Sequence, residues 1–160
     1  MRIIAKLIAI IFFLPLSCFS NEQALNDLKK GGDFYQAHDY KQAAHWFHKS
    51  ANKGSPDAAY NLGLMYAFGK GVAENQSNAV HWLKKSAIQG HPHAQHRLGL
   101  AYQTGNGVLK DLDQTIHWFK ASADRGYVKA QMALALMYTS GEGVLKDQKQ
   151  AAHWYSKAAK

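Results

Sequence analysis

A period of 36 residues organises this chain. The string Gly69-Lys70-Gly71-Val72 returns as Gly105-Asn106-Gly107-Val108 and as Gly141-Glu142-Gly143-Val144, and no insertion breaks the register. The same step relates four His-Trp pairs, at residues 45–46, 81–82, 117–118 and 153–154. A fixed period between about 20 and 50 residues is typical of solenoids, in which each unit buries its apolar face against its neighbours. The sequence therefore predicts a repeat architecture.

Each unit has the pattern of two helices joined by the glycine loop. In the unit from Ser55 to Gly90, Pro56 suits a first helical turn, and apolar residues recur after it at helical spacing. Gly69 supplies the left-handed residue that ends this helix, the second glycine permits a tight return, and Val72 offers an apolar plug beneath the loop. Asn75 then caps the second helix, as Asp111 and Asp147 do in the later copies.

The second helix of the unit separates into a buried stripe and a solvent face. At 100° per residue, Trp82, Leu83 and Ala87 fall on one side of the helix. His81 and Lys85 fall on the other side. The tryptophans are therefore expected to build the core, and the histidines before them are expected at the surface.

The first unit differs from the others because Phe34 to Tyr40 replaces the glycine loop, and Asp39 there can cap a second helix. The chain is therefore expected to be all-α, an α-solenoid of about four antiparallel helix pairs. Helices are expected near residues 22–37, 39–53, 56–68, 75–89, 92–104, 111–125, 128–140 and 147–160.

Three strings carry a family resemblance: Asn61-Leu62-Gly63-Leu64-Met65-Tyr66, Gly105-x-Gly107-Val108-x-x-Asp111 and Ala151-x-x-Trp154-x-x-Lys157-Ala158-Ala159. They resemble the SEL-one-like repeat, a member of the tetratricopeptide-like superfamily, over about residues 43–160. The resemblance implies a right-handed solenoid. It divides the chain into a tetratricopeptide-like first helix pair at residues 21–54 and three SEL-one-like repeats at about 55–90, 91–126 and 127–160.

The first 20 residues predict a secretory signal peptide. Arg2 and Lys6 form a short basic region before an apolar stretch, Leu7 to Leu16, that is too short for a membrane span of roughly 20 residues. Small residues suit cleavage after Ser20, which predicts an exported protein, periplasmic or secreted, with no membrane span after cleavage. Two alternatives are a lipoprotein acylated at Cys18 and an uncleaved anchor.

Charge and cysteine content exclude several functions for the mature chain. Residues 21–160 hold 17 basic and 11 acidic side chains, spread through every repeat, which favours solvated helix faces over nucleic-acid binding. The only cysteine is Cys18, so redox and thiolate catalysis are excluded after cleavage.

Neither metal nor cofactor binding is expected. The densest histidine group is His91, His93 and His96, yet the equivalent positions in neighbouring units hold no matching ligands. The Gly-x-Gly loops lack the third glycine and the preceding strand of a dinucleotide site.

One enzymatic alternative is a small hydrolase, because Ser50-Ala51-Asn52-Lys53 fits the Ser-x-x-Lys pattern of penicillin-recognising enzymes. Cysteine-rich relatives of this repeat family have been described as β-lactamases. The further motifs of such enzymes are absent from this sequence, and Ser50 occupies an inward position shared with Ser86 and Ser122. The expected protein is therefore not an enzyme.

The resemblance implies a non-enzymatic scaffold for protein–protein interaction, with an envelope or host-contact role, whose concave face is lined by the first helix of each pair. A purely structural module of a larger assembly is the other alternative. Arg97 stands near the centre of the expected groove, where an acidic ligand would find its strongest charged contact. The candidate residues for binding a protein or peptide are Tyr60, Asn61, Leu64, His93, His96, Arg97, Leu100, Lys129, Met132 and Leu136.

Overall fold

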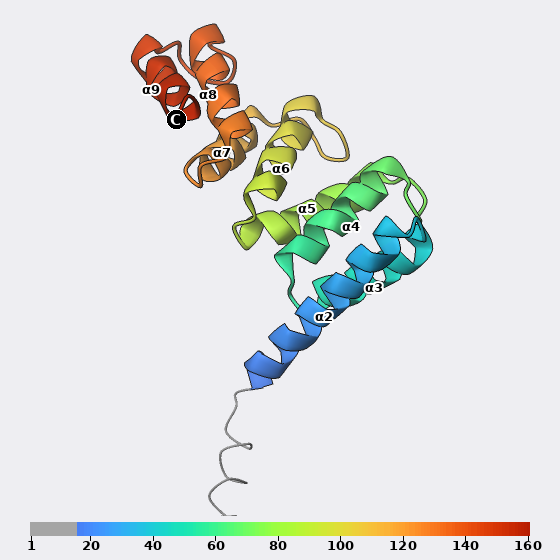
Figure 1. Cartoon of the computed structure of the whole chain (residues 1–160). Coiled ribbons are helices and arrows are strands. Elements are labelled where there is room, and N and C mark those ends of the chain that lie inside the picture. The colour runs from blue at the N-terminus through green and yellow to red at the C-terminus, as the bar shows by residue number, and fades with distance from the viewer. Residues whose placement is uncertain (1–15) are drawn as a thin grey trace, which may run out of the picture.

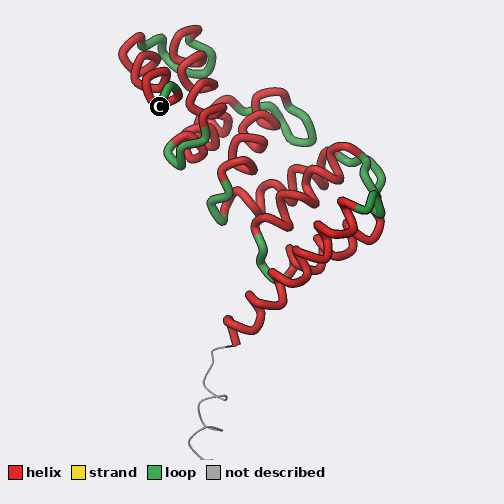
Figure 2. Tube along the Cα trace, in the orientation of Figure 1, coloured by secondary structure: helices red, strands yellow, loops and turns green. Residues whose placement is uncertain are grey.

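The computed structural model of the chain describes residues 16–160, which form eight helices and no strand (Figures 1 and 2). Most of the predicted signal peptide lies outside the described residues. The predicted all-α solenoid of four helix pairs is confirmed. The helices are α2 (Leu16–Gln36), α3 (Tyr40–Asn52), α4 (Pro56–Phe68), α5 (Gln76–Ile88), α6 (Pro92–Thr104), α7 (Leu112–Ala123), α8 (Val128–Ser140) and α9 (Gln148–Ala158).

The helices pack in pairs, and each pair packs on the next. The pairs are α2 with α3, α4 with α5, α6 with α7, and α8 with α9, and α3, α5 and α7 also contact the first helix of the following pair. One apolar cluster, for example, brings Phe47 of α3 together with Leu62 and Met65 of α4 and Trp82 of α5. Two further clusters follow, one across α5, α6 and α7 and one across α7, α8 and α9, so buried apolar residues join each pair to the next.

Helix ends follow the turn and cap residues closely. Gly69, Gly105 and Gly141 end their helices in the left-handed conformation, with φ of 64°, 78° and 81°. The side chains of Asn75, Asp111 and Asp147 accept hydrogen bonds from the first turns of α5, α7 and α9. For α3 to α9, the expected bounds therefore agree with the structure to within two residues at each end.

The second glycine of each loop has a role that the sequence did not show. A methyl group at Gly71 would collide with the carbonyl group of Tyr40, and one at Gly107 would collide with that of Gln76. At Gly143 it would lie 2.9 Å from the Cβ of Leu112. Each glycine loop thus presses on the first turn of the second helix in the preceding pair.

A buried serine near the end of a second helix ties each of the first three pairs together. In the first pair, the Oγ of Ser50 donates to the carbonyl of Ala24 at 2.6 Å. The last pair has Ala158 at this position, which has no hydroxyl group. The other two copies of the bond join Ser86 to the carbonyl of Pro56 and Ser122 to the carbonyl of Pro92, each at 2.7 Å.

Helix α2 corrects one expected boundary. It begins at Leu16, six residues before the expected start, because no glycine or proline interrupts the sequence between Pro15 and Gly31. The predicted cleavage point after Ser20 therefore falls within this helix. In the part of the chain that the structure describes, no helix combines the length and apolar character that a membrane crossing requires.

Candidate protein-binding groove

Three pockets lie between successive first helices of the pairs. The first pocket lies between α2 and α4, the second between α4 and α6, and the third between α6 and α8. Their volumes are about 310, 300 and 390 Å³. Together they form a row along the face of the solenoid made by α2, α4, α6 and α8.

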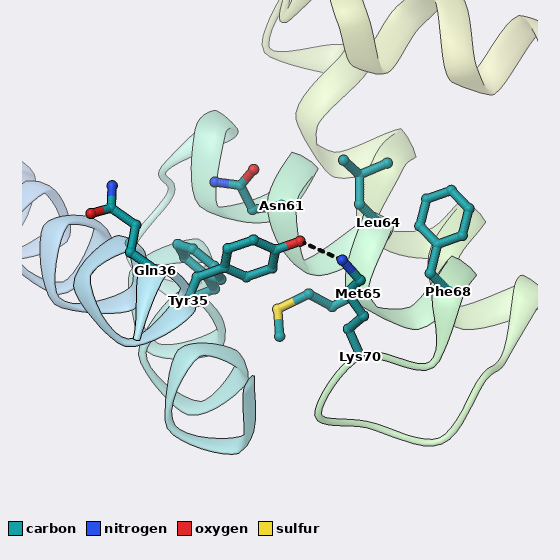
Figure 3. Close-up of a pocket in the computed structure, with 9 residues that line it drawn as sticks. Tyr35, Gln36, Asn61, Leu64, Met65, Phe68 and Lys70 are labelled. Carbon is teal, nitrogen blue, oxygen red and sulfur yellow. Dashed lines mark hydrogen bonds between the residues drawn. The ribbon is translucent and has the colours of Figure 1, made fainter. Parts of the chain in front are cut away.

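The first pocket combines apolar walls with one fixed cation (Figure 3). Leu64 and Phe68 of α4 line one side, and Phe68 is 59% exposed. Opposite them, Tyr35 of α2 accepts a hydrogen bond of 3.0 Å from the Nζ of Lys70 (Figure 3). This bond raises the pKa of Lys70 above its ordinary value, so the ammonium group remains charged beside the pocket.

The second pocket places a guanidinium group beside an exposed aromatic ring. Its lining includes Leu64, Phe68, Arg97 and Leu100. The Cζ of Arg97 lies 5.8 Å from the centre of the Phe68 ring, within cation–π range. The ring therefore helps to hold a positive charge at this pocket.

The third pocket carries a carboxylate in place of a cation. Leu100, Leu136 and Glu142 contribute to its lining. The Oε1 of Glu142 accepts a hydrogen bond of 3.4 Å from the Nε2 of Gln103, which lines the same pocket.

Two positions that recur every 36 residues contribute to the lining of the three pockets: a leucine of the first helix and the middle residue of the glycine loop. Leu64 is shared by the first and second pockets, and Leu100 is shared by the second and third. The middle residue of each Gly-x-Gly loop closes one pocket, and its formal charge changes from positive to neutral to negative along the row: Lys70, Asn106 and Glu142.

A cluster of aromatic and imidazole rings lies at the beginnings of α4, α6 and α8. His91 stacks on Tyr60 with ring centres 4.6 Å apart, and His93 meets Tyr127 edge-on, also at 4.6 Å. His96 lies 5.1 Å from Tyr127 and stacks at 5.4 Å on Phe119, a core residue of α7. These rings join three consecutive repeats.

Burial lowers the pKa of two of these imidazoles. It lowers the pKa of His96 to about 4, and the nearby charges of Arg97 and Lys129 act in the same direction. Burial also lowers the pKa of His91, although Asp57, 3.3 Å from its Nε2, opposes this shift. The Nδ1 of His91 accepts a hydrogen bond from the backbone of Ala94, so this ring caps α6.

The structure places the ten candidate residues in three groups. Tyr60, His93 and His96 belong to the ring cluster. Lys129 and Met132 are exposed on α8 and do not line the three pockets. The remaining five line the pockets: Asn61, Leu64, Arg97, Leu100 and Leu136.

Sequence reasoning missed several pocket residues. Tyr35 was missed because the shorter first turn shifts α2 by four residues relative to the 36-residue period, so its equivalence to Gln103 and Thr139 is hidden. The variable residue within each glycine loop was also missed, although its regular spacing was visible. Variation at one position of an otherwise constant loop was the signal that could have found Lys70 and Glu142.

The structure shows the surroundings of the residues considered for a hydrolase site and for a metal site. Ser50 is fully buried and its hydroxyl is bonded to a carbonyl, so a substrate cannot reach it. Lys53 instead bonds Asp27 at 2.7 Å. Within residues 16–160, no group of three or more histidine, cysteine, aspartate or glutamate side chains is arranged to hold a metal ion.

Comparison with known proteins covers most of the chain. The family model described as "Sel1 repeat" matches residues 29–55, 56–91, 92–127 and 128–160. Its first match thus includes residues 29–54 of the segment at residues 21–54 that was expected to be tetratricopeptide-like. A comparison with curated proteins found no significant match.

Three solved structures are similar. A protective antigen of uropathogenic Escherichia coli with an SLR fold is 39% identical, with a TM-score of 0.82 over 85% of this chain and 30% of that one. A Sel1 repeat protein from Oxalobacter formigenes is 32% identical, with a TM-score of 0.77 over 83% of this chain and 53% of that one. Helicobacter pylori cysteine rich protein B is 22% identical, with a TM-score of 0.54 over 56% of this chain and 67% of that one, and shares the fold alone. The present chain spans about a third and about half of the first two relatives.

Proposed function

Because the chain belongs to the Sel1 repeat family, whose members generally act as scaffolds for protein–protein interaction, we propose that it holds a segment of a partner protein along the row of three pockets. The observation that carries this proposal is the regular sharing of Leu64 and Leu100 between neighbouring pockets. A bound segment would place apolar side chains in successive pockets, with the shared leucines between them.

The charged residues beside the pockets favour one orientation of the bound segment. Lys70 and Arg97 accompany the first two pockets, and Glu142 accompanies the third. An acidic side chain of the partner fits beside the first two pockets, where Arg97 offers a bidentate contact. A neutral or basic side chain fits beside the third. The reversed orientation would bring like charges together, so it is disfavoured.

Peptide selection tests this function directly. We expect the full chain to select, from a displayed library of random peptides, sequences with spaced apolar residues and an acidic residue toward one end. Arg97→Glu should weaken binding of a selected peptide by about 1–3 kcal/mol without changing the melting temperature. The affinity is measured by isothermal titration calorimetry.

The chain offers a chemically identical control for this substitution. Arg125→Glu makes the same change at an exposed site in the turn between α7 and α8, near Gly90 and away from the pockets. If both variants lose affinity equally, net charge and not the groove governs binding. If neither loses affinity, the working surface lies elsewhere and the groove assignment fails.

We also propose that the protein is exported and works in the cell envelope or in contact with a host. The support is the sequence before Asn21: a basic start, an apolar stretch and small residues. Amino-terminal sequencing of the protein from the exported fraction should begin at Asn21. An intact Met1 in that fraction, or a lipid on Cys18, would contradict the predicted cleavage.

A further inference from the structure

The net positive charge of the chain after residue 20 lies entirely on the second helices. Residues 21–160 carry a formal charge of +6, from 17 basic and 11 acidic side chains. The first helices hold four of each sign, and the connecting segments with the last residues hold six of each. The second helices hold one acidic residue, Asp113, and seven lysines: Lys41, Lys49, Lys84, Lys85, Lys120, Lys149 and Lys157.

All seven lysines are exposed, as is Asp113. Favourable interaction with the helix dipole accounts for the lysines in the last turns of these helices. It does not account for Lys41, Lys84 or Lys149. Asp27, a buried carboxylate of α2, lies 2.7 Å from Lys53 and 3.9 Å from Lys49, so it neutralises chiefly Lys53.

Tryptophan rings hold three of these lysines in place. The Nζ atoms of Lys49, Lys85 and Lys157 lie 4.6, 4.3 and 4.6 Å from the centres of the rings three residues earlier. Cation–π contacts of this kind restrict a flexible lysine. The cations therefore form an ordered array, and a ligand that binds them loses less conformational entropy in the protein.

The same face contains a pocket of about 490 Å³, which we call the second-helix pocket. Leu62, Tyr66 and Val72 contribute apolar groups to its lining. The ring of His48 meets the ring of Trp82 at 5.1 Å, which brings α5 against this wall. Polar residues of α3 form its wall: Lys41, His45, His48, Lys49 and Asn52.

We propose that this face is a second docking surface, for an acidic segment of a partner protein. A large apolar side chain of the segment fills the second-helix pocket, and flanking aspartates or glutamates meet Lys41 and Lys49. This surface is separate from the row of three pockets, and its lining residues are different. The inference therefore does not depend on the groove.

The chemistry of the face favours a carboxylate-bearing segment over nucleic acid. Its cations are all lysines, and it lacks the arginines that read phosphates and bases in bidentate fashion. Trp82, Trp118 and Trp154 are buried, and the half-buried Trp46 has the ammonium groups of Lys30 and Lys49 over its ring, so these rings offer no open stacking platform to bases. A pocket that combines the apolar groups of Leu62 and Val72 with the cations Lys41 and Lys49 instead matches a large side chain next to carboxylates.

Fluorescence anisotropy with a defined probe tests the proposal. The probe is a labelled peptide of glutamates with one central leucine, and the protein is the full chain. We expect binding that weakens with salt, and at least threefold weaker binding when alanine replaces the leucine. The triple variant Lys41→Glu, Lys49→Glu, Lys85→Glu should lose at least tenfold in affinity.

A matched triple variant distinguishes a loss of affinity caused by the second-helix lysines from one caused by the change in net charge. Lys110→Glu, Lys146→Glu and Lys160→Glu make the same change in charge at exposed residues outside the second helices. Equal loss in both triple variants, each shown to be folded by circular dichroism, would overturn the proposal. So would tighter binding of polyuridylate, or of vesicles containing phosphatidylglycerol, than of the acidic peptide. An excess of a peptide selected for the groove should not displace the probe, which separates this result from that of the groove.

Discussion

The first and second helices come from one repeat, yet they vary in opposite ways. On the first helices, equivalent pocket positions change from unit to unit, as from Asn61 to Arg97 to Ala133. On the second helices, a His-Trp pair recurs in all four units, and the buried serine recurs in three. The positions that change from unit to unit thus include those over the pockets, whereas the recurring serines and the tryptophans at positions 82, 118 and 154 are buried between helices.

Exposure over the pockets accounts for this difference. Helices α3 to α8 each pack against two neighbouring helices, so the side chains between them are constrained on both sides. Each first helix leaves one face over the pockets with exposed apolar side chains such as Phe68 and Leu136. Substitutions there cost little stability, which leaves these positions free to determine specificity.

The largest expected effect is a loss of stability, which differs between two residues that line the third pocket. Phe119 of α7 is 1% exposed and packs against Gly99 and His96. Phe119→Ala should lower the free energy of unfolding by about 3–5 kcal/mol, because a large cavity opens in the core. Leu100→Ala, on the same pocket but 36% exposed, should cost about 1 kcal/mol or less. Urea denaturation measures both, and equal losses would erase the distinction between buried core positions and positions over the pockets.

The next prediction compares the stability lost when valine replaces each of the two glycines of one loop. Gly105→Val should cost roughly 1–3 kcal/mol, because the left-handed conformation is strained for valine. Gly107→Val should cost about 2–4 kcal/mol, since a side chain there also meets the backbone of Gln76. The order of the two denaturation midpoints is the observation to make. If Gly105→Val is the more damaging variant, the contact between the loop and α5 is not important.

A smaller effect concerns the pH dependence of stability. The pKa of His96 is about 4 in the folded chain, below the value near 6.5 of an unfolded histidine, so the unfolded state binds the proton first. The stability that this neutral imidazole gives is complete above about pH 6.5 and declines as the pH falls toward about 4. Partial exposure limits the loss to about 1–2 kcal/mol.

Substitution at His96 identifies this contribution. Met132 occupies the equivalent position in the next repeat, so His96→Met is compatible with the fold. Urea denaturation at pH 7 and at pH 4.5 should show a smaller difference in the variant than in the wild type. An unchanged difference would assign the pH dependence to other groups.

The smallest effect is expected on the outer face. His117 is exposed, and its ring meets only the edge of Trp118 at 4.8 Å among the aromatic contacts. His117→Ala should stay within about 0.5 kcal/mol of the wild type in thermal denaturation. A larger loss would mean that the repeated His-Trp contact contributes to the constant core.

The sequence predicted the features that local chemistry and periodicity determine. Helix ends at Gly69 and caps such as Asn75 depend on backbone conformation and nearby amides, so residue type predicts them. Five of the ten candidate residues line the pockets because one face of a helix can be followed through the repeats.

The remaining features depend on how one unit is rotated against the next. The contact between Gly71 and Tyr40 joins different units, and no residue pattern within one unit encodes it. The same holds for the stacking of His96 on Phe119 and for the separation of Met132 from the pockets. These arrangements follow from side-chain packing between repeats, which a single period does not specify.

The alanine at position 158 has a consequence for the order in which the solenoid opens. In a stack of repeats, stability is approximately the sum of each unit and its contacts with neighbours. In each of the first three pairs a serine hydroxyl donates a hydrogen bond from one helix to the other, whereas the pair of α8 and α9 has alanine at that position. Amide hydrogens of this last pair should therefore exchange with solvent sooner than those of α4 to α7. Since α8 forms one side of the third pocket, that end of the groove is the part of the scaffold best able to adjust to its ligand.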